Sequence, residues 1–148
     1  MRVIGIEIAG SEIRWAILDG DNKTGSIDGV EPPKLTLPVS GSDEADNLIT
    51  LRDQVRTALT AKKPDSVAII RADKGTSVMR AKMECIVQLA AKEAKVPCKL
   101  ISPLTVDAAK KRKIQNVTGT TFEGAYGKPQ FSYLIPALYC AWSVLNGS

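Results

Sequence analysis

The chain opens with two short segments whose apolar positions predict strands. Residues 2–9 are mainly apolar and are interrupted at Glu7, whereas residues 12–18 alternate strictly between two faces. One face of the second segment carries Ile13, Trp15 and Ile17, and the other carries Arg14, Ala16 and Leu18. Gly10 lies in the short turn between the segments and permits turn conformations that other residues avoid. This pattern predicts an antiparallel hairpin.

The rest of the chain alternates between helical and extended patterns. A polar, glycine-rich stretch precedes a third strand, which neighbouring prolines place at a sheet edge. The four later helices have apolar residues at helical spacing or a clear start signal, such as Ser102 followed by Pro103. The predicted elements are strands at 34–39, 66–71 and 98–101, helices at 43–61, 77–95 and 136–146, a helix from 102 to 113, and a loop at 118–129.

This order predicts an α/β fold with a mixed five-stranded sheet. Three antiparallel strands form a meander, two parallel strands follow with their helices, and helices cover both faces. The 148 residues suit a single domain, 1–148, with a composition close to the globular average. No apolar run is long enough to cross a bilayer, and the N-terminus lacks a signal-peptide pattern, so we expect a cytoplasmic protein.

The composition excludes several kinds of chemistry. Histidine is absent, so neither Ser-His-Asp nor Cys-His catalysis can be built, and a zinc site with imidazole ligands is excluded. The three cysteines, Cys85, Cys98 and Cys140, have no CxxC spacing and are interpreted as reduced thiols in or near the core. Any metal would need oxygen ligands, which favours Mg²⁺ or Mn²⁺.

The charge pattern permits a nucleic-acid partner without requiring one. The net charge is +4, and the densest basic cluster closes the third predicted helix, 102–113, with Lys110, Lys111, Arg112 and Lys113. Such a cluster can bind phosphates with an affinity that falls steeply with salt. It can equally be a solvated helix end that complements the helix dipole. Aromatic residues are only 5%, so a broad stacking platform for single strands is not expected.

Three stretches together resemble the ribonuclease H-like superfamily, and most closely its RuvC-like resolvase branch. They are Val3-Ile4-Gly5-Ile6-Glu7 with Gly10-Ser11, then Val67-Ala68-Ile69-Ile70, and then Ile101-Ser102-Pro103 through Ala109-Lys110-Lys111 to Asn116-Val117-Thr118-Gly119. The sequence is also similar to a small bacterial family of unassigned function with this fold. The resemblance implies phosphodiester hydrolysis by two metal ions that several carboxylates hold.

The acidic positions implied by the resemblance are only partly filled. Glu7 stands at the acidic position of the first strand, whereas Ile70, Tyr133 and Pro136 stand where further acids are expected. Asp73 follows the buried strand by three residues, at the strand end where ligands of open α/β sheets tend to lie. Glu7 and Asp73 are therefore the candidate catalytic and metal-binding residues.

Each candidate also has a purely structural interpretation. Glu7 can pair with Arg71 or Lys74 at the sheet end, and Asp73 can be a solvated turn residue. Glu84 is expected to be exposed on its helix, and Asp107 to complement a helix start.

Three hypotheses of function remain open from the sequence. The first is a nucleic-acid-binding protein with a degenerate or weakly active nuclease site, at which Mg²⁺ or Mn²⁺ could act. The second is a catalytically inert interaction module that dimerises through the apolar last helix, which carries Leu138, Tyr139 and Trp142. The third is a nucleotide-phosphate binder, because the first hairpin faintly resembles the phosphate-binding turn of the actin and sugar-kinase superfamily.

Overall fold

The computed structural model describes residues 1–20, 25–28, 34–36, 44–112 and 133–145. Its elements are β1 (Arg2–Ala9), β2 (Glu12–Gly20), β3 (Gly25–Asp28), β4 (Lys34–Thr36), α1 (Glu44–Lys62), β5 (Ser66–Ile70), α2 (Val78–Glu93), β6 (Cys98–Ile101), α3 (Pro103–Arg112) and α5 (Ile135–Leu145). The predicted loop at 118–129 and Lys113 lie outside the described residues. The predicted strands and helices elsewhere agree closely with these bounds.

A mixed sheet forms the centre of the molecule. Its body consists of β2, β1, β5 and β6 in that order, with β1 antiparallel to β2 and parallel to β5, and β6 parallel to β5. Two short strands, β3 and β4, both pair antiparallel with β2. The prediction of five strands is therefore wrong. Residues 25–28 lie in a stretch whose glycine and aspartate content favours turns, so its sequence does not predict the strand that they form.

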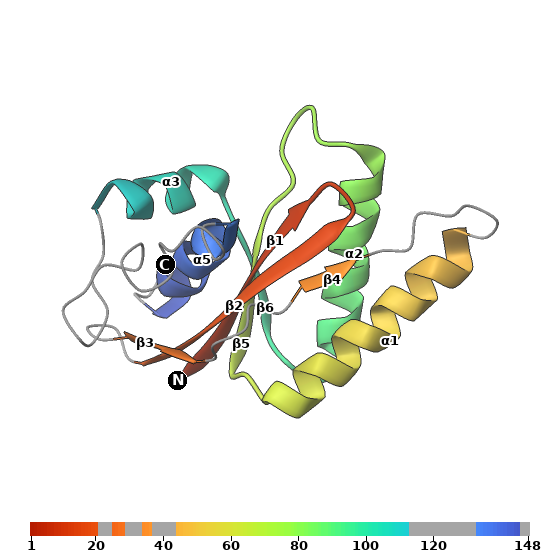
Figure 1. The fold of residues 1–148 in the computed structure, drawn as a ribbon, viewed down its shortest axis with the longest axis horizontal. Coiled ribbons are helices and arrows are strands. Elements are labelled where there is room, and N and C mark those ends of the chain that lie inside the picture. Colours follow the sequence, from red (N-terminus) through yellow and green to blue (C-terminus); the bar gives the residue numbers. More distant parts are fainter. Residues whose placement is uncertain (21–24, 29–33, 37–43, 113–132, 146–148) are drawn as a thin grey trace.

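The alternation along each strand separates two cores. Ile4, Ile6 and Ile8 of β1 pack with α1 and α2, together with apolar residues of β2 and β5. The other face of the sheet packs with α3 and α5 and contains Val3 of β1 and Ala16 of β2. Figure 1 shows α1 and α2 on one side of the sheet and α3 and α5 on the other. The result is a three-layer α/β/α sandwich.

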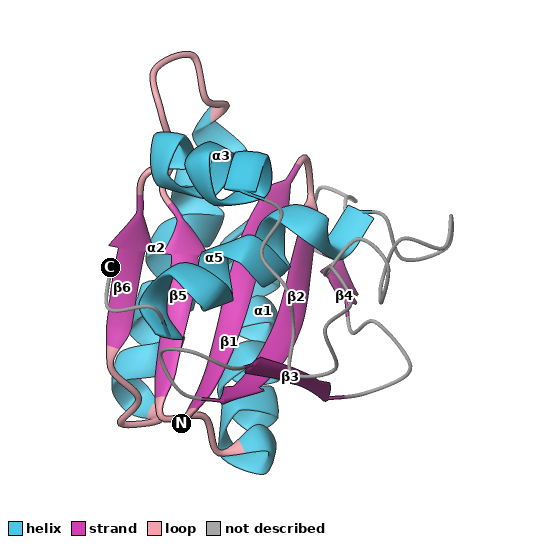
Figure 2. Ribbon diagram, turned by 90° about the vertical axis from the view of Figure 1, so that its left-hand side faces the viewer, coloured by secondary structure: helices cyan, strands magenta, loops and turns pink. Residues whose placement is uncertain are grey.

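Helix α5 lies directly against β1 at Gly5. A Cβ atom at Gly5 would lie 2.8 Å from the backbone N of Ala141 and closer still to the carbonyl O of Ala137. Glycine is thus required by the close approach of the helix. Figure 2 shows α5 crossing in front of the sheet.

Burial of α5 within the fold explains why the last helix is apolar on several sides. Leu138 and Tyr139 are completely buried, and Trp142 is partly buried. A homodimer through this helix stays a prediction, and of these three side chains only Trp142 is accessible to a partner.

The cysteines differ in their burial. All three are free; Cys140 is buried and Cys98 partly buried, but Cys85 is exposed, contrary to the expectation of a place in or near the core. Among the helices that the structure describes, none has the length and apolar character that crossing a bilayer requires.

Candidate phosphate-binding cavity

The first-strand acid, Glu7, lies near the carboxyl end of β1, on the sheet face that α3 and α5 cover. The parallel register pairs Ile6 of β1 with Ile69 of β5, which places Glu7 beside Ile70. Carboxyl ends of parallel strands are the usual ligand-binding end of an open α/β sheet. Two of the positions at which the resemblance expects acids are therefore adjacent in space.

A cavity of about 200 Å³ opens at this end of the sheet. Its lining comes from β1, β5, α2, α3 and α5. We call it the Glu7 cavity, and its lining residues are Glu7, Ile70, Arg80, Pro103, Val106, Asp107, Lys110 and Pro136.

Arg14 is the ion-pair partner of Glu7. The turn of Gly10 and Ser11 sets a hairpin register that places the two residues opposite each other on β1 and β2. Arg14 Nη1 lies 3.6 Å from Glu7 Oε1, whereas Arg14 Nε donates a shorter hydrogen bond of 3.0 Å to Glu12 Oε2. The Arg14 guanidinium also lies 5.4 Å from the ring centroid of Tyr133. Arg14 therefore neutralises Glu7 only in part, and it replaces the partners Arg71 and Lys74 that the sequence suggested.

Two further positively charged side chains line the cavity, and neither forms a salt bridge with a described residue. Arg80, in the first turn of α2, approaches the Ile70 carbonyl O with Nη2 at 3.5 Å, and its buried Nε has no hydrogen-bond partner among the described residues. Lys110, near the end of α3, is half-buried and makes no ion pair within the described part of the chain. A buried donor without a partner has lost its hydrogen bonds to water and has gained none in the protein. Such a group therefore favours binding of an acceptor from a ligand.

The electrostatics of Glu7 reflect these neighbours. Its side chain is only 21% exposed. Burial raises the pKa of the Glu7 carboxyl above its ordinary value, whereas the positive charges of Arg14, Arg80 and Lys110 act in the opposite direction. One partly desolvated carboxylate thus faces three cations.

Asp73, the second candidate, does not line the Glu7 cavity. It belongs to the turn between β5 and α2, where its backbone N–H donates to Thr76 Oγ1 at 2.9 Å and its Oδ1 accepts from the Lys74 N–H at 2.8 Å. This arrangement is that of a capped, exposed turn. A catalytic or metal-binding role for Glu7 and Asp73 together stays a prediction.

Glu84 corrects another expectation. Instead of being exposed on α2, it is buried, with a relative exposure of 8%. Its Oε2 accepts a hydrogen bond of 2.7 Å from the Ala72 N–H. The carboxylate therefore anchors the start of the 71–76 turn to α2.

The basic cluster divides into residues with different surroundings. Lys110 lines the Glu7 cavity, whereas Lys111 and Arg112 are exposed. Arg112 lines a separate groove with Trp142 and other residues of α3 and α5. A run of basic residues on a helix cannot share one environment, because successive side chains point about 100° apart.

Comparison with known proteins places the chain in a family. Residues 1–123 match the family described as Protein of unknown function (DUF3010). The chain belongs to that family. No curated protein sequence matches the chain.

Solved structures show that the fold is that of RuvC-type resolvases. Thermus thermophilus RuvC in complex with a Holliday junction substrate has a TM-score of 0.72 at 18% identity, covering 97% of this chain and 91% of that one. The fowlpox virus Holliday junction resolvase has a TM-score of 0.62 at 15% identity and full coverage of both chains. Yeast mitochondrial Ydc2, also a Holliday junction resolvase, has a TM-score of 0.63 at 12% identity, covering 97% and 78%. The ribonuclease H-like fold is thereby confirmed.

The two-metal centre that this fold family implies does not fit the residues of the Glu7 cavity. Ile70 and Pro136 supply no ligand oxygen from their side chains. The lining contains two carboxylates, Glu7 and Asp107, and the cations Arg80 and Lys110 already balance their charge where two metal ions would have to bind. In the described residues, no group of three or more acidic, cysteine or histidine side chains is gathered around a possible ion.

Arg14 and Arg80 are the site residues that the sequence analysis did not identify, and the sequence contained a signal for Arg14 alone. A two-residue turn after Ala9 pairs Glu7 with Arg14 by simple counting, so the ion pair was readable from the hairpin. Arg80 had no such signal, because its place in the cavity depends on how α2 is set against β5.

Proposed function

We propose that this protein binds nucleic acid by holding backbone phosphate at the Glu7 cavity, and that it does so without two-metal cleavage. The observation that carries the proposal is that Arg80 and Lys110 line the same cavity and that the buried Arg80 Nε has no hydrogen-bond partner among the described residues. A phosphate oxygen would give the buried Arg80 Nε the acceptor that it lacks.

Fold similarity suggests which nucleic acid to test first. The RuvC structure from Thermus thermophilus is a complex with a Holliday junction substrate, and its fold matches this chain over 97% of its length. A four-way DNA junction is therefore our proposed ligand class, ahead of plain duplex. Exposed Lys111 and Arg112 on α3 would extend the phosphate contacts beyond the cavity.

The charge balance argues against hydrolysis. Two divalent ions in one centre need several carboxylates to offset their charge, and this cavity offers Glu7 and the exposed Asp107 against two cations. Arg14 further engages Glu7. A phosphate that sits in this cavity is stabilised by side-chain cations, which bind but do not activate water.

The test measures binding of a labelled four-way junction by fluorescence anisotropy at low salt. We expect Lys110→Ala and Arg80→Ala each to weaken binding by about fivefold or more, since a lost phosphate contact is worth about 1 kcal/mol. Lys62→Ala is the matched control, because Lys62 is exposed at the end of α1. Unchanged affinity in both cavity variants, or no binding at all, would reject the proposal.

A second measurement addresses cleavage. The same junction is incubated with the protein in Mg²⁺ and in Mn²⁺, and the strands are resolved on a denaturing gel. We expect intact strands in both. Cleavage that disappears in Glu7→Gln would show a working metal site and overturn the non-catalytic part of the proposal.

A further inference from the structure

The strand β6 has one edge that pairs with no other strand in the described part of the chain. Figure 2 shows β6 at the end of the sheet opposite β3 and β4. The Pro97 and Ile101 carbonyls accept hydrogen bonds from Val67 and Arg71 at 2.9 and 2.8 Å, so these residues face β5. Since backbone groups alternate along a strand, Cys98 and Leu100 direct their N–H and C=O groups away from β5. None of these four groups has a partner among the described residues.

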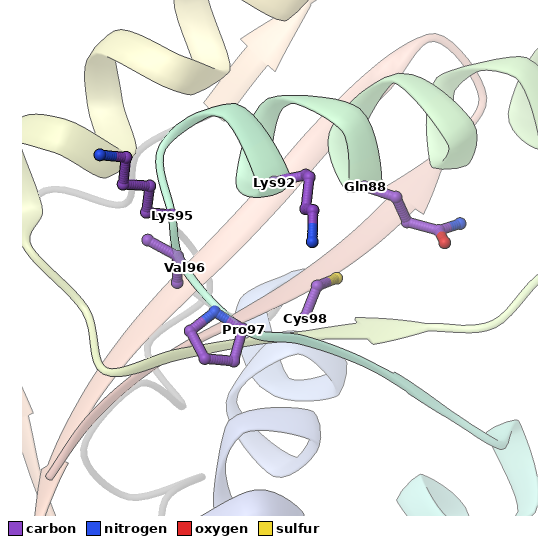
Figure 3. A pocket seen from close by; sticks show the side chains of 6 residues that line it. All are labelled: Gln88, Lys92, Lys95, Val96, Pro97 and Cys98. Atoms are coloured by element: carbon purple, nitrogen blue, oxygen red, sulfur yellow. The ribbon is translucent and has the colours of Figure 1, made fainter.

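A hollow of about 540 Å³ lies beside this edge, between the end of α2 and the start of β6. Gln88, Lys92, Lys95, Val96, Pro97 and Cys98 line it, and no acid is among them. Figure 3 shows the Lys92 ammonium pointing toward Cys98, and Lys95 pointing away. Burial and the nearby Glu84 raise the pKa of the Cys98 thiol to about 11, so the floor of the hollow is neutral.

The two sides of the edge differ in character. Cys98 packs with the core under α2, so Leu100 shares that side by alternation, and its side chain is 43% exposed. Ile101 belongs to the core under α5, which places the exposed Lys99 on that opposite side. An incoming strand would thus meet Leu100 and Cys98, with Lys92 close by, on one side and Lys99 on the other.

We propose that β6 accepts an added strand from a partner protein, an extended peptide in which apolar residues alternate with acidic ones. Its main chain would pair with Cys98 and Leu100, as in other cases of strand addition. Apolar side chains would pack against Leu100 and Cys98, and acidic ones would lie near Lys99. A second copy of this chain is disfavoured as occupant, because two such edges would bring their lysines together.

The inference is independent of the proposed function, since it concerns β6 and the end of α2 rather than the Glu7 cavity. The probe is a short fluorescein-labelled peptide of alternating valine and glutamate. We expect saturable binding with a Kd of about 100 µM or tighter by fluorescence polarisation. The same peptide with lysine in place of glutamate, and one N-methylated at alternate residues, should not bind.

Two variants localise the binding. Leu100→Pro removes an outward N–H that the sheet does not use, so the fold should persist while peptide binding falls at least tenfold. Lys99→Glu should weaken binding about fivefold without touching the backbone, and Lys62→Glu should leave it unchanged. Thermal unfolding of each variant checks that the fold is retained.

Three outcomes would overturn the inference. The first is no saturable peptide binding up to about 1 mM. The second is peptide binding that Leu100→Pro and Lys99→Glu both leave unchanged. The third is sedimentation showing a dimer that Leu100→Pro dissociates, which would make a second copy the occupant.

Discussion

At the residue scale, Glu7 would have opposite effects on ligand binding in a metal site and in a phosphate-binding cavity. As a metal ligand it would be required for any function. As a neighbour of bound phosphate it is a repulsive charge that Arg14, Arg80 and Lys110 offset. The two interpretations therefore predict effects of opposite sign for the same substitution.

We predict that Glu7→Gln tightens junction binding at neutral pH by about threefold or more, equivalent to about 0.7 kcal/mol. The amide keeps the shape of the side chain and removes a negative charge close to the phosphate. Anisotropy titrations of wild type and variant in parallel measure the change. Weaker binding by the variant would point back to a cation held at Glu7.

The pH dependence supplies the control for that prediction. Burial raises the pKa of Glu7, so the wild-type carboxyl protonates at a higher pH than an exposed glutamate. As the pH falls through this raised value, the wild type loses its negative charge and should approach the affinity of Glu7→Gln. The variant lacks the carboxyl, so a difference that persists at low pH would mean that charge is not the cause.

Individual residues also show where sequence reasoning succeeds and fails. The position of Glu7 on an inward face could be read from alternation, and Arg14 follows from counting across the turn. Glu84 was expected to be exposed and is buried, because its carboxylate accepts a hydrogen bond from the Ala72 N–H, while the turn keeps Asp73 exposed. Both depend on hydrogen bonds to specific backbone groups, which a one-dimensional pattern does not encode.

At the scale of elements, the contact between β1 and α5 sets the cavity. Gly5 lies two residues before Glu7 on the same strand face, and Pro136 at the start of α5 lines the cavity. Close approach at Gly5 therefore holds α5 where it closes one wall. The sequence predicted both elements, but only their packing shows why residue 5 must be glycine.

We predict that Gly5→Ala destabilises the fold by about 2 kcal/mol or more, because the added methyl meets backbone atoms of Ala137 and Ala141 rather than a movable side chain. Urea unfolding followed by circular dichroism measures the change. Gly10→Ala is the matched control: Gly10 has φ of 61° but nothing within 4 Å of an added Cβ, so only conformational strain of about 1 kcal/mol is expected. Equal losses of unfolding free energy in the two variants would mean that α5 can shift away from an added methyl group at little cost.

Most helices and strands could be predicted from the sequence, and the exception is the pairing at the outer side of β2. Helical spacing, the Ser102 cap and the apolar run of β5 predicted the elements in the later part of the chain. The outer side of β2 was expected to pair with one strand and instead pairs with both β3 and β4. Short edge strands carry little hydrophobic pattern, because pairing with the neighbour, rather than burial of both faces, defines them.

At the scale of the whole molecule, the net charge of +4 offers a competing explanation for any DNA binding. Diffuse positive charge attracts DNA without a site, and a localised site attracts it through particular contacts. Salt titration of variants that remove the same total charge separates the two. The fold similarity to resolvases cannot do so, since the fold alone does not fix which side chains line the sheet end.

We predict that the double variant Arg80→Ala with Lys110→Ala reduces the slope of log affinity against log salt by about two, one for each lost phosphate contact. The control double variant, Lys62→Ala with Lys92→Ala, removes the same charge from two exposed positions away from the Glu7 cavity and should leave the slope nearly unchanged. Anisotropy titrations of the four-way junction at several KCl concentrations give all three slopes. If both double variants lower the slope equally, net charge alone explains the binding, and the Glu7 cavity loses its role.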